Sequence, residues 1–302
     1  KFMNISGSEG LVAAGNIFMG MTESPVLIKN YLPTMNRSEI FLVMVSGMGT
    51  IAGSVMGTYI GMLGGTDPAA KVLFATHLLS ASVMAVPGSI VLAKMLCPQT
   101  EEATDHVAIS GKEKENSNIL DAISSGTVTG VKLMTNIAAM LLVFISLVAL
   151  ANYITEGVIG RYTGLNDWIV KITDGKAQGL TFQFILGVIT SPFMWLIGVP
   201  SQDIMLVGSL LGQKTILNEF VAYFQLQQWK DAGLFMYEKS ILMSTYILCG
   251  FANISSIGIL LGGLGVLAPE KRGLISRIGV PAMIGGALVS VLSATIIGMI
   301  LG

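Results

Sequence analysis

Long apolar segments alternate with short polar ones along the whole chain. A helix needs about 20 mostly apolar residues to cross the hydrocarbon core of a bilayer. Continuous apolar candidates of this length are residues 39–63, 71–96, 132–154, 241–267 and 279–301. The pattern therefore predicts an all-α polytopic membrane protein.

Two other apolar segments, residues 8–32 and 201–228, are interrupted in the middle by polar residues. We expect each to form a re-entrant hairpin of two half-helices, because proline and buried carboxylates interrupt a simple spanning helix. The interrupting residues are Gly20, Glu23 and Pro25 in the first segment, and Asn218 and Glu219 in the second. The hairpin tips are then at residues 20–23 and near residues 218–219.

The order of hairpin, broken helix and helix occurs twice. The first copy is 8–32, 39–63 and 71–96, and the second is 201–228, 241–267 and 279–301. Thr22-Glu23 corresponds to Asn218-Glu219, and residues 49–54 correspond to residues 252–256. If 132–154 is the only spanning helix between the copies, the second copy is inverted. Inverted repeats whose broken helices meet near the bilayer midplane are a transporter plan.

These repeats suggest three parts of the chain. Residues 1–96 form the first repeat of a transport domain and residues 180–302 the second. Residues 97–179 lie between them and contain a polar loop, a scaffold helix at 132–154 and an external loop. The stretch 180–199 contains Pro192, and its sequence leaves open whether it spans the membrane or lies at the interface.

Composition agrees with a membrane location. The 302 residues are 52% hydrophobic and 12% charged, whereas soluble domains carry about 25% charged residues. The net charge of -1 gives no basic footprint for nucleic acid. The bias of Lys and Arg between the loops places the hairpin-bearing side of the first repeat in the cytoplasm and the C-terminus outside.

Unwound membrane segments expose backbone carbonyls that need partners. Sodium is a hard cation, and such oxygens can coordinate it. The residues that could supply them, as backbone carbonyls or side-chain oxygens, are Asn16, Met19, Thr50 and Ile51. The alternative is helix packing, with the Thr50 hydroxyl bonded back to its own helix.

Glu219 is the strongest chemical signal in the chain. A carboxylate accepts several hydrogen bonds and can therefore hold a vicinal diol such as that of a ribose. Asn253 and Ser256 are three residues apart, on one helix face, and can complete a sugar site. Alternatively, these groups pair with one another to stabilise the bundle. Glu23, next to Thr22, is placed to bind a planar polar group.

Other polar residues suggest no chemistry. We expect Lys214 to reach the membrane surface or to pair with Asp203, and we assign it no transport role. The chain has no nucleophile–base arrangement, no phosphate loop and no metal-spaced set of Cys and His. An enzyme is therefore not predicted.

Several motifs together resemble the concentrative nucleoside transporters. They occur in the family's order and cover nearly the whole chain. The motifs are Asn16–Pro25, Ser38-Glu39-Ile40, Gly49–Val55, His77–Met84, Asn218–Tyr223 and Cys249–Gly258.

The resemblance implies a sodium- or proton-driven nucleoside symporter of the inner or plasma membrane that assembles as a homotrimer. A mobile transport domain moves against a trimeric scaffold in that family. The implied nucleobase residues at the first tip are Gly20, Met21, Thr22 and Glu23. The implied ribose residues are Glu219, Asn253 and Ser256, with Val55 and Phe251 as walls of the site. The implied sodium ligands are Asn16, Met19, Thr50 and Ile51.

Three departures from the family pattern affect the prediction. Met21 stands where the family typically has Gln, and a thioether cannot replace an amide that donates and accepts. Base selectivity is therefore left open. Thr50 stands where many sodium-coupled members have Ser, so a hydroxyl is kept. The helices that precede the first hairpin in the family are missing, which predicts an N-terminally truncated chain.

The resulting hypothesis is a Na+-coupled nucleoside importer. The alternatives are a proton-coupled symporter of a nucleoside or related compound, and a membrane protein with a polar pore and no coupled transport.

Overall fold

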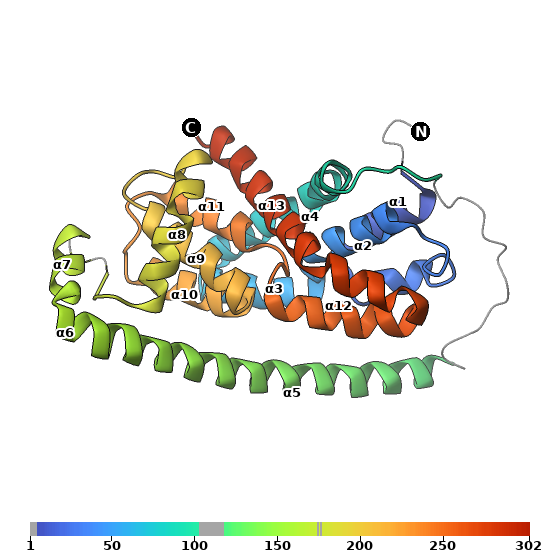
Figure 1. Cartoon of the computed structure of the whole chain (residues 1–302), viewed down its shortest axis with the longest axis horizontal. Coiled ribbons are helices and arrows are strands. Elements are labelled where there is room, and N and C mark those ends of the chain that lie inside the picture. The colour runs from blue at the N-terminus through green and yellow to red at the C-terminus, as the bar shows by residue number, and fades with distance from the viewer. Residues whose placement is uncertain (1–4, 103–117, 174, 176) are drawn as a thin grey trace. The chain divides into compact units, whose positions relative to one another are not determined.

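The computed structural model describes residues 5–102, 118–173, 175 and 177–302, and the regular structure of this part is entirely helical (Figure 1). Residues 103–117, most of the predicted polar loop, lie outside the described residues. The chain divides into two compact units. One unit consists of residues 1–107 and 185–302, and the other of residues 108–184. All the candidate site residues belong to the first unit.

The first hairpin begins with α1 (Gly7–Gly15), which has a reciprocal cap. Ser6 Oγ accepts from the Glu9 backbone N–H, and the Glu9 carboxylate accepts from the Ser6 N–H. The other Glu9 carboxylate oxygen binds Lys94 Nζ at 2.6 Å. This partly buried ion pair fixes the start of the hairpin against the end of α4 (Pro68–Leu96).

The second limb of this hairpin differs from the prediction of a half-helix. It is a short 3-10 helix, η1 (Ser24–Ile28), followed by turns up to Thr34. Pro25 and Pro33 explain the difference, because each lacks a backbone donor and disfavours helix at the preceding residue. Ser24 Oγ instead donates to Val12 O at 2.9 Å and holds this limb against α1.

Both predicted broken helices are interrupted near the expected positions. The first consists of α2 (Arg37–Gly49) and α3 (Gly53–Gly64). The second consists of α11 (Glu238–Leu248) and α12 (Ile254–Leu267). We call residues 50–52 the first gap and residues 249–253 the second gap.

The two gaps meet inside the unit. Phe251 N–H donates to Thr50 O at 3.2 Å. Gly250 has φ 156°, and a Cβ atom there would lie 2.9 Å from Met48 O. Only glycine allows the two backbones to approach this closely. The crossing thus joins residues about two hundred positions apart in sequence.

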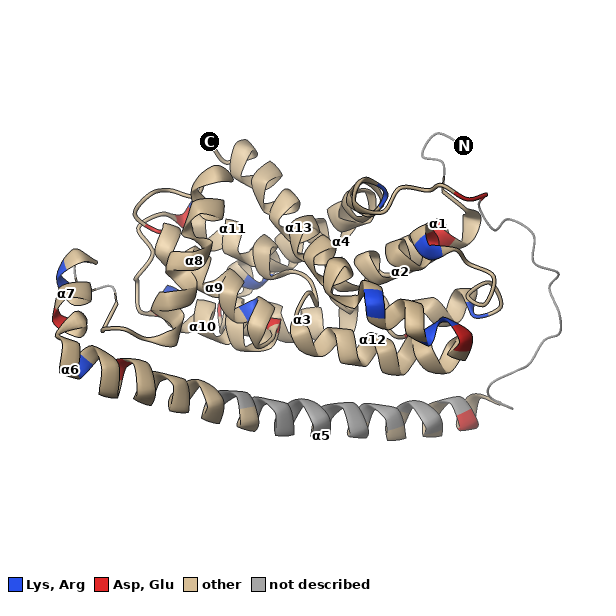
Figure 2. Cartoon of the chain, in the orientation of Figure 1, with Lys and Arg blue, Asp and Glu red and all other residues tan. Residues whose placement is uncertain are grey.

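Two long helices, α4 and α13 (Arg272–Ile300), follow the broken helices, and α13 packs along α2, α4 and α11. The segments Arg37–Gly64, Pro68–Leu96 and Pro269–Ile300 are long and apolar enough to cross a membrane, by length and composition. Figure 2 shows how few charged residues interrupt these helices. Two buried apolar clusters fill the unit, and Phe251 packs against both.

The second hairpin consists of two helices, α9 (Ile204–Ile216) and α10 (Glu219–Asp231), with its turn at the predicted position. Asn218 caps α10 by accepting from Val221 N–H at 2.9 Å. The preceding stretch forms α8 (Phe182–Leu196). Its 15 residues extend about 22 Å, less than the ~30 Å hydrocarbon core. Glycines such as Gly187 and Gly208 let α8 pack closely on α9.

The second unit is more helical than predicted. The helix predicted as a scaffold, α5 (Ile119–Asn152), has 34 residues and begins well before residue 132. The predicted external loop at 157–179 is instead largely helical, with η2 (Tyr153–Gly160), α6 (Arg161–Thr163) and α7 (Leu165–Ile172). The missed signal in α7 is its apolar spacing, which is that of an amphipathic helix. The apolar positions are Leu165, Trp168, Ile169 and Ile172.

Candidate functional site

Glu219 begins α10 and lies where the second hairpin meets both broken helices. Its carboxylate accepts from Asn253 Nδ2 at 2.9 Å and from Tyr59 OH at 3.3 Å. Glu219 is 7% exposed. A carboxylate has about four lone-pair positions, so these two side-chain donors leave it with acceptor capacity for a ligand.

Asn253 is the N-cap of α12 and is held in a fixed orientation. Its Oδ1 accepts from the backbone N–H of Ser256 at 2.9 Å and from the Ser256 hydroxyl at 3.1 Å. With the oxygen occupied by the helix end, the amide nitrogen points to Glu219. The structure therefore brings Glu219, Asn253 and Ser256 together. Their mutual hydrogen bonds also match the alternative of a paired, bundle-stabilising group.

Tyr59 on α3 is a member of this cluster that the sequence reasoning missed. Its ring stacks on Tyr223 at a centroid distance of 4.1 Å and lies 6.1 Å from the ring of Phe220. A fully buried tyrosine needs a partner for its hydroxyl, but the sequence does not show which residue is that partner. The aromatic group forms one side of the carboxylate cluster.

Asn16 and Thr50, two of the predicted sodium ligands, both form a hydrogen bond with Ser46. Asn16 Nδ2 donates to Ser46 Oγ at 3.0 Å, and Thr50 Oγ1 donates to Ser46 O at 3.0 Å. The Thr50 bond is the back-bonding that the packing alternative predicts. Ser46 was not predicted, although its position one turn before Thr50 is the spacing from which it could have been found.

The side-chain oxygen of Asn16 is fully buried and has no hydrogen-bond partner among the described residues. A buried polar atom without a partner costs free energy and calls for an explanation, such as an ion. An amide oxygen is a ligand that hard cations prefer. The residues present therefore fit a sodium ion beside the first gap.

The other two predicted ligands, Met19 and Ile51, are in the turn after α1 and in the first gap. Gly53 N–H donates to Phe18 O at 3.0 Å, which joins the turn to the gap. The structure thus places all four predicted ligands in two irregular segments that are hydrogen-bonded to each other. Irregular backbone of this kind presents carbonyl oxygens that a helix would use internally.

The tip of the first hairpin packs against helices of both repeats. Met21 is buried beside α2, where a Cβ atom on Gly47 would lie 2.9 Å from Met21 Cβ. Thr22 lies against α12, where a Cβ atom on Gly263 would be 3.0 Å from Thr22 Cγ2. The Glu23 carboxylate folds back over Gly20, and any side chain at position 20 would collide with it.

Glu23 and Glu219 are not in contact in the described part of the chain. Thr22 touches α12 at Gly263, ten residues beyond Asn253, which corresponds to about 15 Å along the helix axis. Val55 on α3 and Phe251 in the second gap both pack on the apolar cluster that contains Tyr59. The predicted site therefore consists of two separate groups of residues connected by α12.

The expectation for Lys214 is wrong. Its side chain is fully buried rather than extended to a membrane surface. Lys214 Nζ donates to Ile247 O at 2.8 Å and to Ser290 Oγ at 2.9 Å. Asp203, the expected partner, accepts instead from the backbone N–H groups of Met236 and Tyr237.

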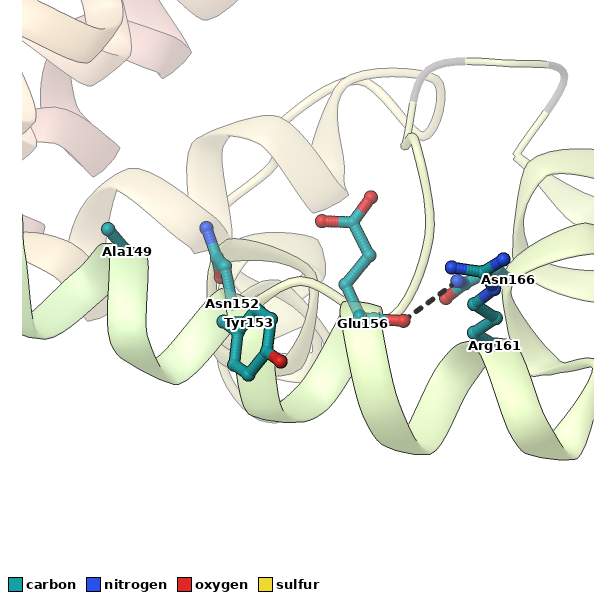
Figure 3. Close-up of a pocket in the computed structure, with 7 residues that line it drawn as sticks. Ala149, Asn152, Tyr153, Glu156, Arg161 and Asn166 are labelled. Carbon is teal, nitrogen blue, oxygen red and sulfur yellow. Dashed lines mark hydrogen bonds between the residues drawn. The ribbon is translucent and has the colours of Figure 1, made fainter.

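The second unit has a surface hollow of about 380 Å3 beside the π-helical segment η2. Figure 3 shows Glu156, Arg161 and Asn166 around it, with Asn166 Nδ2 donating to Glu156 O at 3.0 Å. The hollow contains none of the predicted site residues.

Comparison with protein families gives two matches that together cover most of the chain. Residues 77–298 match the family described as Na+ dependent nucleoside transporter C-terminus. Residues 1–66 match the family described as Gate, nucleoside recognition.

Curated relatives agree with these families. An uncharacterized transporter of Haemophilus influenzae is 39% identical over all of this chain, which covers 68% of that protein. The uncharacterized transporter YutK of Bacillus subtilis is 40% identical over 99% of the chain, again 68% of that protein. Sodium/nucleoside cotransporter 1 of rat is 39% identical over 99% of the chain. The chain spans 45% of the rat protein.

Solved structures show the same fold. The transporter CNTnw in an inward-facing, substrate-bound state matches 97% of this chain with a TM-score of 0.83 and 36% identity. The chain covers 64% of that protein. A doubly substituted CNTnw in an outward-facing state matches 97% of the chain and 65% of CNTnw, with a TM-score of 0.85. This chain therefore belongs to the Na+-dependent nucleoside transporter family, whose members are multi-pass membrane transporters rather than enzymes.

Proposed function

We propose that this chain provides the nucleoside and sodium sites of a Na+-coupled nucleoside importer that works as a homotrimer in the cell membrane. The observation that carries the proposal is the Glu219 cluster. A buried carboxylate, held by Asn253 and Tyr59, keeps acceptor capacity where the second hairpin meets both broken helices. The names of the rat cotransporter and of the matched families support the nucleoside class.

In this proposal the ribose binds at Glu219. Two adjacent hydroxyl groups donate to the two carboxylate oxygens, and the second proton of Asn253 Nδ2 is available to a ribose oxygen. Ser256 fixes the orientation of Asn253 from the end of α12. Hydrogen bonds to an ionised acceptor are stronger than neutral ones, so the diol contributes much of the affinity.

The base is assigned to the first hairpin tip, at Thr22 and Glu23, which must approach Glu219 for one nucleoside to contact both, since Thr22 meets α12 about 15 Å along its axis from Asn253. Glu23 is exposed in the isolated chain, and its carboxylate has no hydrogen-bond or ion-pair partner among the described residues. Such a carboxylate is free to accept from an amino or imino group of a base. Met21 is buried against α2 and offers only a thioether, so it discriminates between bases by shape.

Sodium is assigned to Asn16, Met19, Thr50 and Ile51. The orphaned Oδ1 of Asn16 supports this assignment. The positive charge of the ion would stabilise this oxygen, which has no hydrogen-bond donor. Thr50 O also accepts from Phe251 N–H, and Asn253 N–H donates to Phe251 O at 2.9 Å. Two hydrogen bonds therefore connect the ion site to Asn253, which gives a physical route for coupling ion and ribose affinities.

The test is uptake by the intact protein in proteoliposomes. With an inward sodium gradient, we expect radiolabelled uridine to accumulate above its external concentration. Replacing sodium with potassium should abolish accumulation, and an inward proton gradient alone should not restore it. Accumulation driven by protons without sodium would contradict sodium coupling. Equilibration without accumulation would contradict symport.

A further inference from the structure

Lys214 on α9 is a buried cation that the proposed nucleoside and sodium sites do not use. It is 0% exposed and lies near the end of the first helix of the second hairpin. No carboxylate lies within ion-pair distance of its ammonium in the described part of the chain. Burying an unpaired charge in a membrane protein is expensive and usually marks a function.

The ammonium is instead held by the broken end of α11. Lys214 Nζ donates to Ile247 O at 2.8 Å and to Ser290 Oγ at 2.9 Å. Ser290 Oγ in turn donates to Cys249 O at 3.0 Å. Carbonyls at a helix C-terminus have lost their helical donors, and the helix dipole there favours a cation. Lys214 thus supplies a donor to Ile247 O at the broken end of α11, and it reaches Cys249 O of the second gap through Ser290.

The first gap has the opposite arrangement. There the hairpin residue is Asn16, which presents an oxygen without a donor. Asn16 is seven residues before Glu23, and Lys214 is five residues before Glu219, in the corresponding hairpin. In each repeat, a buried side chain of the hairpin's first helix or the turn after it thus reaches the broken helix. In the first repeat this side chain is Asn16 and presents an amide oxygen; in the second it is Lys214 and presents an ammonium group.

We propose that the Lys214 ammonium is a tethered substitute for a second coupling cation. It fills the ion position of the second gap, holds residues 249–253 in the conformation that presents Asn253 to Glu219, and leaves one sodium per transport cycle, at the first gap. The single-sodium part rests on the proposed function. The positioning part, in which Lys214 acts through the gap on Asn253, does not.

Chemical rescue tests the positioning part. Lys214→Ala removes the ammonium and opens space for a small amine. We expect uridine uptake to fall by about 10-fold or more, since a charge-assisted hydrogen bond is lost. Ethylammonium or propylammonium should restore part of the uptake, whereas tetramethylammonium, which has no N–H donor, should not. Lys214→Met fills the space without a charge and should lose uptake without rescue.

Leu210→Ala is the matched control. Leu210 is one turn earlier on α9 and equally buried, so its truncation leaves a cavity of similar origin without removing a donor. Amines should not improve this variant. Wild-type uptake by Lys214→Met, or a folded Lys214→Ala that no primary amine rescues, would overturn the proposal.

A second readout separates this proposal from the proposed function. Primary amines should raise the melting temperature of purified Lys214→Ala and leave that of the wild type unchanged, whether or not either transports nucleosides. Absence of uridine uptake by the wild type would reject the proposed function alone, and absence of amine stabilisation would reject the Lys214 proposal alone.

If Lys214→Ala does not fold, Ser290→Ala tests the positioning role instead. It keeps the lysine and removes its link to Cys249 O. We expect a raised KM for uridine, by about 5-fold or more, and a nearly unchanged sodium concentration for half-maximal uptake. An unchanged KM would overturn the positioning role.

Discussion

The first and second gaps both interrupt a broken helix, but they differ in whether the nearby buried oxygens have hydrogen-bond donors. In the first, a buried amide oxygen of Asn16 lacks a donor. At the second, Lys214 donates a hydrogen bond to the carbonyl of Ile247, and Ser290 donates one to the carbonyl of Cys249. In our proposal a duplicated helix break does not mean a duplicated ion site, because the buried side chain beside each gap decides whether that gap requires a cation from solution.

The two gaps are also joined, through the hydrogen bond from Phe251 N–H to Thr50 O. An ion at the first gap would therefore act on the same segment that Lys214, in our proposal, positions through Ser290.

Glu219→Gln should have the largest effect. The substitution keeps the shape but removes the charge that holds Asn253 and Tyr59 and accepts from the ribose. We expect uridine uptake to fall by about 100-fold or more, since several charge-assisted hydrogen bonds weaken together. Uptake of radiolabelled uridine measures it, with Glu238→Gln, an exposed carboxylate in the first turn of α11, as the control. Near-normal uptake in Glu219→Gln would remove the ribose assignment.

Asn16→Ala should affect sodium more than nucleoside. It removes the unpartnered oxygen assigned to the sodium site beside the first gap, so the sodium concentration for half-maximal uptake should rise by about 10-fold. Uptake at saturating sodium should recover. Asn30→Ala, in the exposed turn after η1, is the control. An unchanged sodium dependence would mean that the first gap does not hold the coupling ion.

Tyr59→Phe should give a moderate effect. The ring stacking on Tyr223 is kept, while the hydroxyl donor to Glu219 is lost. We expect the KM for uridine to rise by about 3- to 10-fold with little change in sodium dependence. A shift in sodium dependence equal to the shift in KM would show that the two properties are not separable at this residue.

Met21→Gln should have the smallest effect on rate and act mainly on selectivity. The variant supplies a donor and an acceptor where the chain has a thioether. We expect relative uptake among purine and pyrimidine nucleosides to change by about 2- to 5-fold. A competition panel with labelled uridine measures it. The same ranking in both forms would show that position 21 does not discriminate between bases.

The sequence was enough to predict both broken helices, because Thr50 and Asn253 are polar residues within long apolar segments. It also paired Glu219 with Asn253 and Ser256, since membrane carboxylates need partners. The limb after Pro25 was predicted less well, because local proline chemistry overrode the expected symmetry with the second hairpin.

The partners of Lys214 and the role of Tyr59 could not be predicted. Both depend on contacts between helices far apart in sequence, such as α9 with α11 and α3 with α10. Hydropathy shows that such a side chain needs a partner but does not say which one. The amphipathic spacing of α7 was available in the sequence, and the polar composition of residues 157–179 obscured it.

The most direct test of the central claim is the affinity of the purified protein for uridine, measured by calorimetry over a series of sodium concentrations. Where the ion site is largely empty, linkage makes the slope of log Kd against log sodium concentration equal to minus the number of sodium ions bound with the nucleoside. One open gap and one gap closed by Lys214 predict a slope of about -1. A slope near zero would contradict coupling at the first gap, and a slope near -2 would contradict the closed second gap.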